Sequence, residues 1–374
     1  YRFVQRVMQT VAQQRLSRDD RKVRHLAAAE HLQRTADTGE IAGVIAAHYL
    51  GAAEARPDAA DAAELRATAV RHLERAGDRA RSLAAIEEAQ RYYERALALS
   101  EGPGRARLAE VAGIAAQHAA RFERAEELLR EAREAYAADG DAAGVARVAS
   151  WQAETMLDLG RPQEGADLAK TAWTGDDGPA DADAAQLAAA IAMLAVNLPE
   201  LEEDPWPWLD RAARIAEVTG AWDVLGRALS LKGAWLARAN RPVESEALAS
   251  GTFELARRHG LHYRAAIQAL YLAWGALDRD LDEAQRWADE CLARSRRSGD
   301  QFTASGARDA QAMIQVERGD WDEIDVDALR EQWVRATRDG APDHVPLSLV
   351  LLAAGRGERS LLDGGDPELG IELG

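Results

Sequence analysis

The 374-residue sequence predicts an all-α fold, an α-solenoid of antiparallel helical hairpins with a period of about 36–40 residues. Small residues recur at one position of the second helix in successive units. Gly or Ala recurs at a matching position of the first helix, 12 residues earlier. Ala, Leu, Glu and Arg dominate the composition and strand-forming residues are scarce, which favours helix along nearly the whole chain.

Residues 1–57 do not follow this repeat and are predicted to form a helical junction. An apolar stripe predicts a first helix over Val4–Leu16. Ser17 stands before two aspartates and predicts the cap of a second helix, as expected for a side-chain oxygen that accepts from the first turn. A third helix is predicted over residues 40–55, because a proline follows shortly after.

Residues 58–340 are predicted to hold about seven hairpins. The small residue of the second helix recurs at intervals of 36, 40, 80, 39 and 40, at Ala89, Ala125, Gly165, Ser245, Ala284 and Ile324. Its counterparts on the first helix are Gly77, Gly113, Ala153 and Gly233. Because small side chains let a neighbouring helix approach closely, each hairpin is expected to pack on the next. The double interval is interpreted as one degenerate hairpin, with Trp206, Pro207 and Trp208 in an enlarged turn.

The pattern changes after residue 340. Residues 341–374 are predicted to contain a partial helix, Val345–Ala354, and then a disordered tail. The tail from Gly355 onward is rich in glycine and acidic residues and has no apolar period. Since the chain starts at Tyr1 and a polar capping helix is not evident at its end, we expect it to be a fragment of a longer protein.

The repeated positions resemble the tetratricopeptide repeat (TPR) family. In that family a bulky and a small residue on the first helix precede Ala, an aromatic residue and Ala on the second. One unit carries the pattern in full, as Leu73, Gly77, Ala89, Tyr93 and Ala96. The resemblance implies a right-handed solenoid and a protein-binding role. The usual TPR period is about 34 residues, so these helices are expected to be roughly one turn longer.

A second resemblance covers about the first 57 residues. It is carried by Tyr1-Arg2-Phe3, Val11, Leu16, Arg18, Arg21, His25, Ala28 and Ala47-His48-Tyr49. This string is similar to the junction of large bacterial signalling ATPases of the STAND type, where a nucleotide-binding module and a winged helix lead into a TPR array. Gln5 departs from the pattern, which has His there. Relatives join the array to a class III nucleotide cyclase or a LuxR-type DNA-binding domain. The resemblance implies an upstream ATPase domain in cis and transfers no active-site residue.

The net charge of −17 argues against a nucleic-acid partner, because phosphate binding needs clustered Lys and Arg. Residues 1–35 nevertheless carry eight basic and three acidic side chains. We interpret this segment as a solvated face or a docking surface toward an upstream domain. No signal peptide opens the sequence, and its longest apolar run, Leu187–Val196, is too short to cross a bilayer. We expect a cytoplasmic location and no membrane partner.

The search for catalytic, metal or cofactor motifs finds no convincing pattern. The sequence has no Gly-x-x-x-x-Gly-Lys-Ser/Thr loop to hold phosphates. His259 and His262 have no third ligand in a pattern that suits zinc. His48-Tyr49 is more typical of a packed or capping pair than of a general base. Cys291 lies at a small-residue position and is predicted to be a buried, unreactive thiol. We therefore expect a protein without catalysis or cofactors.

A row of arginines is the first candidate contact surface. In the TPR family the second position of the first helix faces the concave groove. In four units here it is Arg71, Arg107, Arg147 and Arg227. Because Arg can bind carboxylates with two parallel hydrogen bonds, this row predicts an acidic segment or chain terminus as partner. The alternative is that Arg71 and Arg107 form only weak surface pairs with Glu74 and Glu110, one helical turn further on.

The tryptophans are the second candidate. All ten lie at or after residue 151. Trp235 and Trp274 share one repeat position and are predicted to pack between units, whereas Trp206 and Trp208 flank a proline and are predicted to be exposed contacts.

These observations predict a non-catalytic scaffold or sensor arm that binds a protein or peptide. The alternative is a small-ligand effector domain, or an enzyme, with a pocket in the Trp-rich half, residues 151–290.

Overall fold

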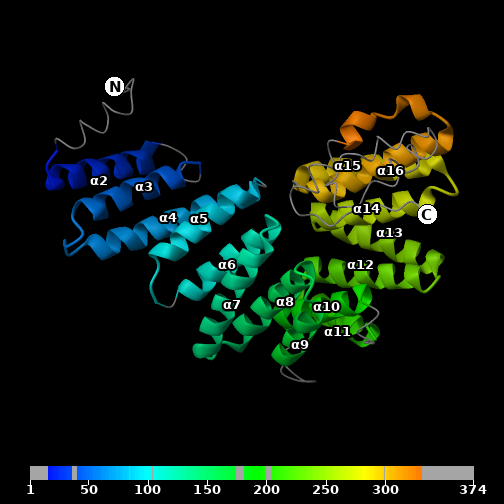
Figure 1. Cartoon of the computed structure of the whole chain (residues 1–374), viewed down its shortest axis with the longest axis horizontal. Helices are drawn as coiled ribbons and strands as arrows, with labels where there is room; N and C mark the ends of the chain where they lie inside the picture. Colours follow the sequence, from blue (N-terminus) through cyan, green and yellow to red (C-terminus); the bar gives the residue numbers. More distant parts are fainter. Residues whose placement is uncertain are drawn as a thin grey trace. The chain divides into compact units, whose positions relative to one another are not determined.

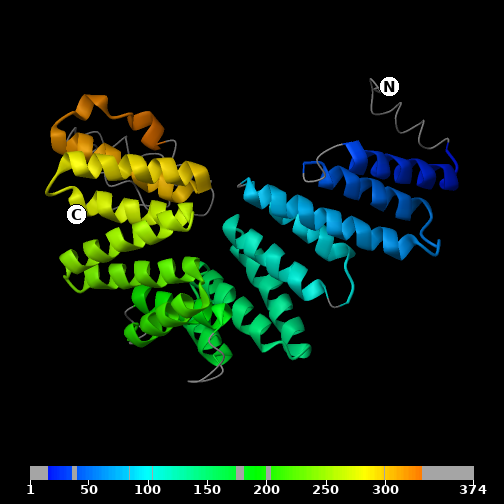
Figure 2. The same ribbon diagram turned by 180° about the vertical axis from the view of Figure 1, so that it is seen from behind.

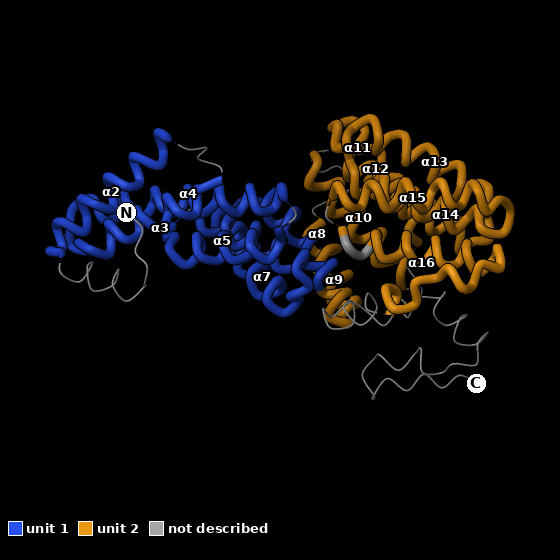
Figure 3. The backbone as a smooth tube through the Cα atoms, turned by 90° about the horizontal axis from the view of Figure 1, so that it is seen from above, with its two compact units in different colours: residues 1–155 blue, residues 156–374 orange. Residues whose placement is uncertain are grey.

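The computed structural model describes residues 16–35, 40–83, 85–102, 104–173, 181–198, 204–298 and 300–330. In this part of the chain every regular element is a helix, which confirms the predicted all-α class (Figure 1). The chain divides into two compact units, residues 1–155 and 156–374, coloured separately in Figure 3. Each unit is described by itself.

Unit 1 is a succession of antiparallel hairpins in which every helix up to α7 packs on the next. Its helices are α2 (Arg18–Thr35), α3 (Ala42–Ala55), α4 (Ala62–Ser82), α5 (Ile86–Leu99), α6 (Arg105–His118), α7 (Phe122–Ala138) and most of α8 (Ala142–Asp158). The two helices predicted within residues 17–55 are α2 and α3. Ser17 caps α2 as predicted, since its Oγ accepts a hydrogen bond of 3.1 Å from the amide of Asp20.

Unit 2 continues the same alternation, as the view from behind shows (Figure 2). Its helices are α9 (Pro162–Ala172), α10 (Ala182–Asn197), α11 (Trp206–Thr219), α12 (Trp222–Arg238), α13 (Pro242–Arg258), α14 (His262–Ala276), α15 (Leu281–Ser298), α16 (Gln301–Arg318) and the short 3-10 helix η2 (Trp321–Glu323). From α10 onward, first helices of neighbouring hairpins also contact each other: α10 packs on α12, α12 on α14, and α14 on α16. These contacts define each unit as an α-solenoid of TPR-like hairpins.

The degenerate hairpin predicted from the double interval is α10 and α11. Leu209 takes the position that small residues hold elsewhere, and Ala216 follows seven residues later; both are fully buried. The repeat position could not be recognised from the sequence because a leucine replaces the small residue there.

The turns inside two of the hairpins, between α8 and α9 and between α12 and α13, share one design. Gly160 and Asn240 end their helices with φ of 69° and 58°, in the left-handed region that Gly and Asn tolerate best. Pro162 and Pro242 then start the next helix, where the missing amide hydrogen costs nothing.

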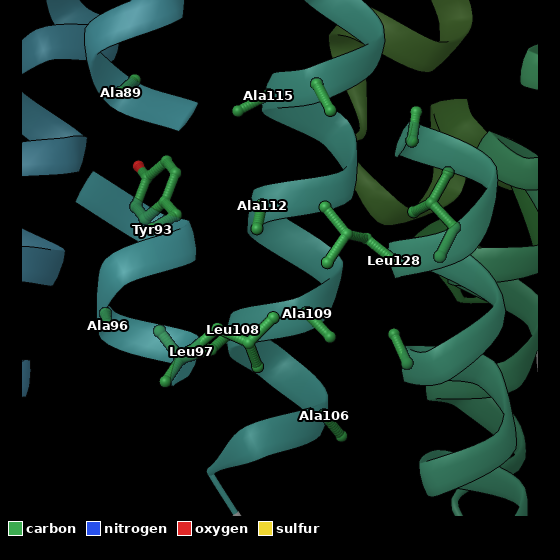
Figure 4. Close-up of a cluster of buried hydrophobic side chains, with 14 of the residues drawn as sticks. Ala89, Tyr93, Ala96, Leu97, Ala106, Leu108, Ala109, Ala112, Ala115 and Leu128 are labelled. Atoms are coloured by element: carbon green, nitrogen blue, oxygen red, sulfur yellow. The ribbon is translucent and has the colours of Figure 1, made fainter. Parts of the chain in front are cut away.

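Alanine forms most of the apolar core, which lets helix backbones lie close together. In unit 1 the face of α5 with Ala89, Tyr93 and Ala96 meets α6, and Leu128 of α7 packs on the other side of α6 (Figure 4). The tightest contact is at Gly77 of α4, where an added Cβ would lie 2.5 Å from the ring of Tyr93. Both residues belong to the TPR-like pattern noted in the sequence.

Several predicted features lie outside the described residues. They are the first predicted helix apart from Leu16, the helix Val345–Ala354 and the tail that follows it. Among the described helices, none combines the length and apolarity that a bilayer crossing requires.

We expect Gly77→Ala to lower the free energy of unfolding, although alanine favours helix by about 1 kcal/mol. The Tyr93 ring cannot move aside easily, because its hydroxyl donates a 2.8 Å hydrogen bond to Asp78, so the overpacking costs about 1–3 kcal/mol. Gly251 of α13 is the control: no atom lies within 4 Å of an added Cβ there, so Gly251→Ala should stabilise its helix. Chemical denaturation, with hydrogen exchange in α4 and α13, measures both; a Gly77→Ala variant as stable as Gly251→Ala would contradict the packing.

Candidate functional site

The four predicted arginines lie on first helices: Arg71 on α4, Arg107 on α6 and Arg147 on α8, in unit 1, and Arg227 on α12, in unit 2. Arg71 and Arg107 are exposed, Arg147 is half-buried, and Arg227 is only 7 % exposed. The equivalent positions therefore differ strongly in what they can offer to a partner.

Within unit 1 the arginines connect neighbouring hairpins. Arg107 on α6 binds Glu74 on α4 at 2.6 Å. Arg147 on α8 binds Glu110 on α6, with Nε 2.5 Å and Nη2 3.0 Å from its two carboxylate oxygens. Each glutamate thus pairs with the arginine of the following hairpin. The alternative prediction was that each glutamate pairs with the arginine one turn earlier on its own helix. It named the correct glutamates, but their arginine partners lie on the next first helix.

Glu110 is the centre of a buried network. Its side chain is only 7 % exposed, and the Tyr136 hydroxyl donates a 2.7 Å hydrogen bond to its second oxygen. The Arg147 guanidinium also lies over the Tyr136 ring, 5.5 Å from its centroid. Burial, and then the hydrogen bond to Glu110, raise the pKa of Tyr136 to about 12, so this hydroxyl remains a donor at neutral pH. The network fastens α6, α7 and α8 to one another.

Arg227 has a different environment in unit 2. Its Nη2 lies 3.2 Å from the Met193 sulfur on α10, beneath the protein surface. The side chain therefore packs between two first helices, and most of its surface is closed to a partner.

Exposed cationic surface remains at Arg71 and Arg107. Arg71 donates a 2.9 Å hydrogen bond to Thr68 on its own helix, and the Arg107 side chain keeps 55 % of its surface exposed beside Glu74. These two guanidinium groups on neighbouring first helices have the chemistry to bind carboxylates.

The prediction for Trp206 and Trp208 needs correction, because the two residues lie in the first turn of α11 and are half-buried. Asp204 accepts a 3.1 Å hydrogen bond from the Trp206 amide, and Pro207 suits a first helical turn. The Asp-Pro-Trp-Pro sequence is thus a helix start that was interpreted as a loop.

Charged residues cover both indole rings. Lys232 lies 4.7 Å from the centroid of Trp206, and Arg211 lies 5.4 Å from that of Trp208 and 5.3 Å from that of Trp173. The rings of Trp173 and Trp208 also meet edge to face at 5.4 Å. These are packing contacts within unit 2.

Two tyrosines on α14 were missed at the sequence level. Tyr263 and Tyr271 are about half exposed, at 46 % and 47 %. They are eight residues apart, so they share one face of the helix. This spacing was visible in the sequence, but it is also the spacing of core residues, and only the structure shows that the face is open. Arg264 lies 5.3 Å from the Tyr263 ring and is held by Asp223 of α12 at 2.9 Å.

The remaining candidates are packed residues. His259 stacks on Trp222, with ring centroids 4.4 Å apart, and the described residues contain no group of three His, Cys, Asp or Glu that could hold a metal ion. Cys291 is fully buried, and burial raises its pKa to about 11, so its thiol is unreactive as predicted.

No protein-family model matches the sequence, and no curated protein does. The fold is similar to that of a signal transduction ATPase with numerous domains (STAND) with a tetratricopeptide repeat sensor from Pyrococcus horikoshii, with a TM-score of 0.50 and 14% identity. That match covers 81% of this chain and 51% of the other, so the chain spans about half the length of that protein. It is also similar to a Rap protein complexed with Competence and Sporulation Factor, with a TM-score of 0.56 and 12% identity, over 92% of this chain and 99% of that one. At these identities the likeness establishes a TPR-like fold.

We expect Arg147→Ala to destabilise unit 1 by about 1.5–3 kcal/mol, because it leaves the buried carboxylate of Glu110 without its cation. Arg107→Ala is the matched control and should cost only about 0–1 kcal/mol, since that pair is exposed. Urea denaturation measures both. Adding Glu110→Gln to Arg147→Ala should recover part of the loss, and equal effects of the two single substitutions would refute the network as a brace.

Proposed function

We propose that this chain is a non-catalytic interaction scaffold or sensor arm of a multidomain bacterial signalling ATPase. In the full-length protein it follows the ATPase domain in cis and works in the cytoplasm. Its relatives by the junction sequence are linked to class III cyclases or LuxR-type regulators, and the proposal extends that context to this chain. A partner bound to the helical hairpins would then bias the upstream switch. The fold likeness to a protein whose name includes a TPR sensor supports the proposal.

The observation that carries the proposal is the pair Arg71 and Arg107. Both are exposed, and they lie on the first helices of two consecutive hairpins. The Arg107–Glu74 ion pair holds α4 and α6 side by side, and packed helices lie about 8–10 Å apart. An extended peptide rises about 3.3 Å per residue and its successive side chains point to opposite faces, so carboxylates two positions apart share a face, lie about 6.6 Å apart and can reach both arginines. The partner we propose is therefore a protein segment with two acidic residues at that spacing.

The other predicted contact residues have a smaller part in this proposal. Arg147 and Arg227 serve mainly to hold neighbouring helices, while Trp206 and Trp208 offer only their half-buried edges. In unit 2 the open face of Tyr263 and Tyr271 is the better place for an additional contact.

Fluorescently labelled peptides with two glutamates two positions apart should bind, and the same peptides with glutamine should bind at least about tenfold more weakly. Each charge-assisted hydrogen bond contributes about 1.5–3 kcal/mol, and salt should weaken it. Arg71→Ala with Arg107→Ala should abolish the preference for glutamate. Arg91→Ala, an exposed arginine on the second helix α5, is the control and should leave binding unchanged. Equal affinity for both peptide sets in fluorescence anisotropy would rule out this surface.

We further expect the purified chain to hydrolyse no ATP and to form no cyclic nucleotide, because the sequence has no phosphate-binding loop. Phosphate release and cyclic nucleotide formation measure this, with a mock purification as the control. Turnover that co-elutes with the chain through two different columns would show that it is an enzyme.

A further inference from the structure

The first described helix of unit 1, α2, is attached by limited apolar packing and by several polar contacts. Only Ala29 is fully buried in α2, and Leu26 is partly buried against Ala52, Ala53 and Leu65, so apolar burial contributes less here than between the later helices. Near its start Lys22 pairs with Asp61 at 2.5 Å, and Arg56 pairs with Asp19. Further along, the contacts of α2 with α3 and α4 run through histidine rings.

The first histidine contact joins His25 of α2 to His48 of α3, with their Nδ1 atoms 3.1 Å apart. An N–H···N hydrogen bond at this distance needs one ring to donate and the other to accept, so one Nδ1 must carry no proton. Gly51 of α3 leaves room for the His25 ring, since an added Cβ would lie 2.7 Å from it. The packing thus holds the two rings together.

The second contact joins Gln33 of α2 to His72 of α4. The Tyr49 hydroxyl donates to Gln33 Oε1 at 3.2 Å, which leaves the amide Nε2 to donate to His72 Nε2 at 3.0 Å. His72 is only 4 % exposed and stacks on Tyr49, with ring centroids 5.7 Å apart. Its Nε2 can accept only while the ring is neutral.

The surroundings favour neutral rings. Burial, and then His25, lower the pKa of His48; burial, and then Arg75 and Arg71, lower the pKa of His72. The charged groups that act on His72 are Arg75 and Arg71, and the ion pairs between α2 and the helices beside it are Lys22–Asp61 and Arg56–Asp19.

We propose that α2 is an acid-released helix: protonation of His48 and His72 converts both acceptors into donors and separates α2 from α3 and α4. Protonated His72 then sets an N–H against the N–H of the Gln33 amide, and a cation becomes buried without a partner. The His25–His48 contact fails in the same way once both rings are protonated, because neither Nδ1 can then accept. The ion pair Lys22–Asp61 persists, since the hydrogen bond from Lys22 lowers the pKa of Asp61. This part of the junction sequence, residues 18–35, therefore separates from unit 1 on mild acidification, while the hairpins that follow stay folded.

The direction of the effect follows from the lowered pKa values. Both lie below the unfolded value of 6.5, so the stabilising contribution is complete above about pH 6.5 and is lost as the pH falls through the folded-state values. The contribution of these two histidines to the stability of α2 is expected to stay constant between pH 7 and 8.

Hydrogen exchange of the whole 374-residue chain at pH 7.4 and 5.5, corrected for intrinsic rates, tests the proposal. Protection of residues 18–35 should fall at least about tenfold at pH 5.5, while α6 and α7 keep theirs. In the variant with His48→Asn and His72→Gln, side-chain oxygens replace the two acceptors and do not titrate, so α2 should stay protected at both values. His31→Asn changes an exposed histidine of the same helix and should behave as the unchanged protein.

The proposal would be overturned if α2 of the unchanged protein kept its protection at pH 5.5. It would also be overturned if the double variant were protected at pH 7.4 and lost that protection at pH 5.5. If the double variant does not hold α2 at pH 7.4, an NMR titration of the unchanged chain decides. His48 and His72 that titrate below pH 6.5, together with the opening of α2, support the proposal; titration at or above 6.5 refutes it.

Discussion

The close approach of helices through small side chains is the constraint on which the structure depends. Alanine provides most of the buried apolar residues, and in unit 1 Gly77 brings α4 within contact of the Tyr93 ring. Each alanine buries little area, so apolar burial alone gives a weak preference for one register between hairpins. Small residues allow the helices to pack closely, and other interactions must fix the register in which they pack.

Polar contacts between hairpins supply that register. The bidentate pair of Arg147 with Glu110 joins the first helices of consecutive hairpins, and Tyr136 ties in the second helix between them. In unit 2, Gln268 of α14 donates a 2.6 Å hydrogen bond to the buried Ser230 of α12, and Arg264 binds Asp223 nearby. Such contacts are directional and costly to leave unpaired, which makes a shifted packing unfavourable.

The same device limits where the chain can bind. An arginine that neutralises a buried carboxylate is committed to the fold, so the row of equivalent positions divides into braces and contact residues. Burial decides which is which: Arg147 and Arg227 are enclosed by neighbouring helices, whereas Arg71 and Arg107 face solvent. At α2 polar contacts add to the limited apolar packing of Ala29 and Leu26, and the proposed sensitivity of that helix to the charge on two rings follows from them.

The sequence by itself determined the helical class, the hairpin period, the cap at Ser17 and the recurring small positions such as Gly77, because local propensity and the spacing of small residues act within one or two helices. It also indicated the helix positions of the four arginines. Only the tertiary structure decided that Glu110 pairs with Arg147 instead of an arginine on its own helix, that Trp206 and Trp208 start a helix, and that His25 meets His48. These outcomes depend on how far one helix is rotated against another. Many small packing contacts set that rotation, and it cannot be inferred from the identity of any single residue.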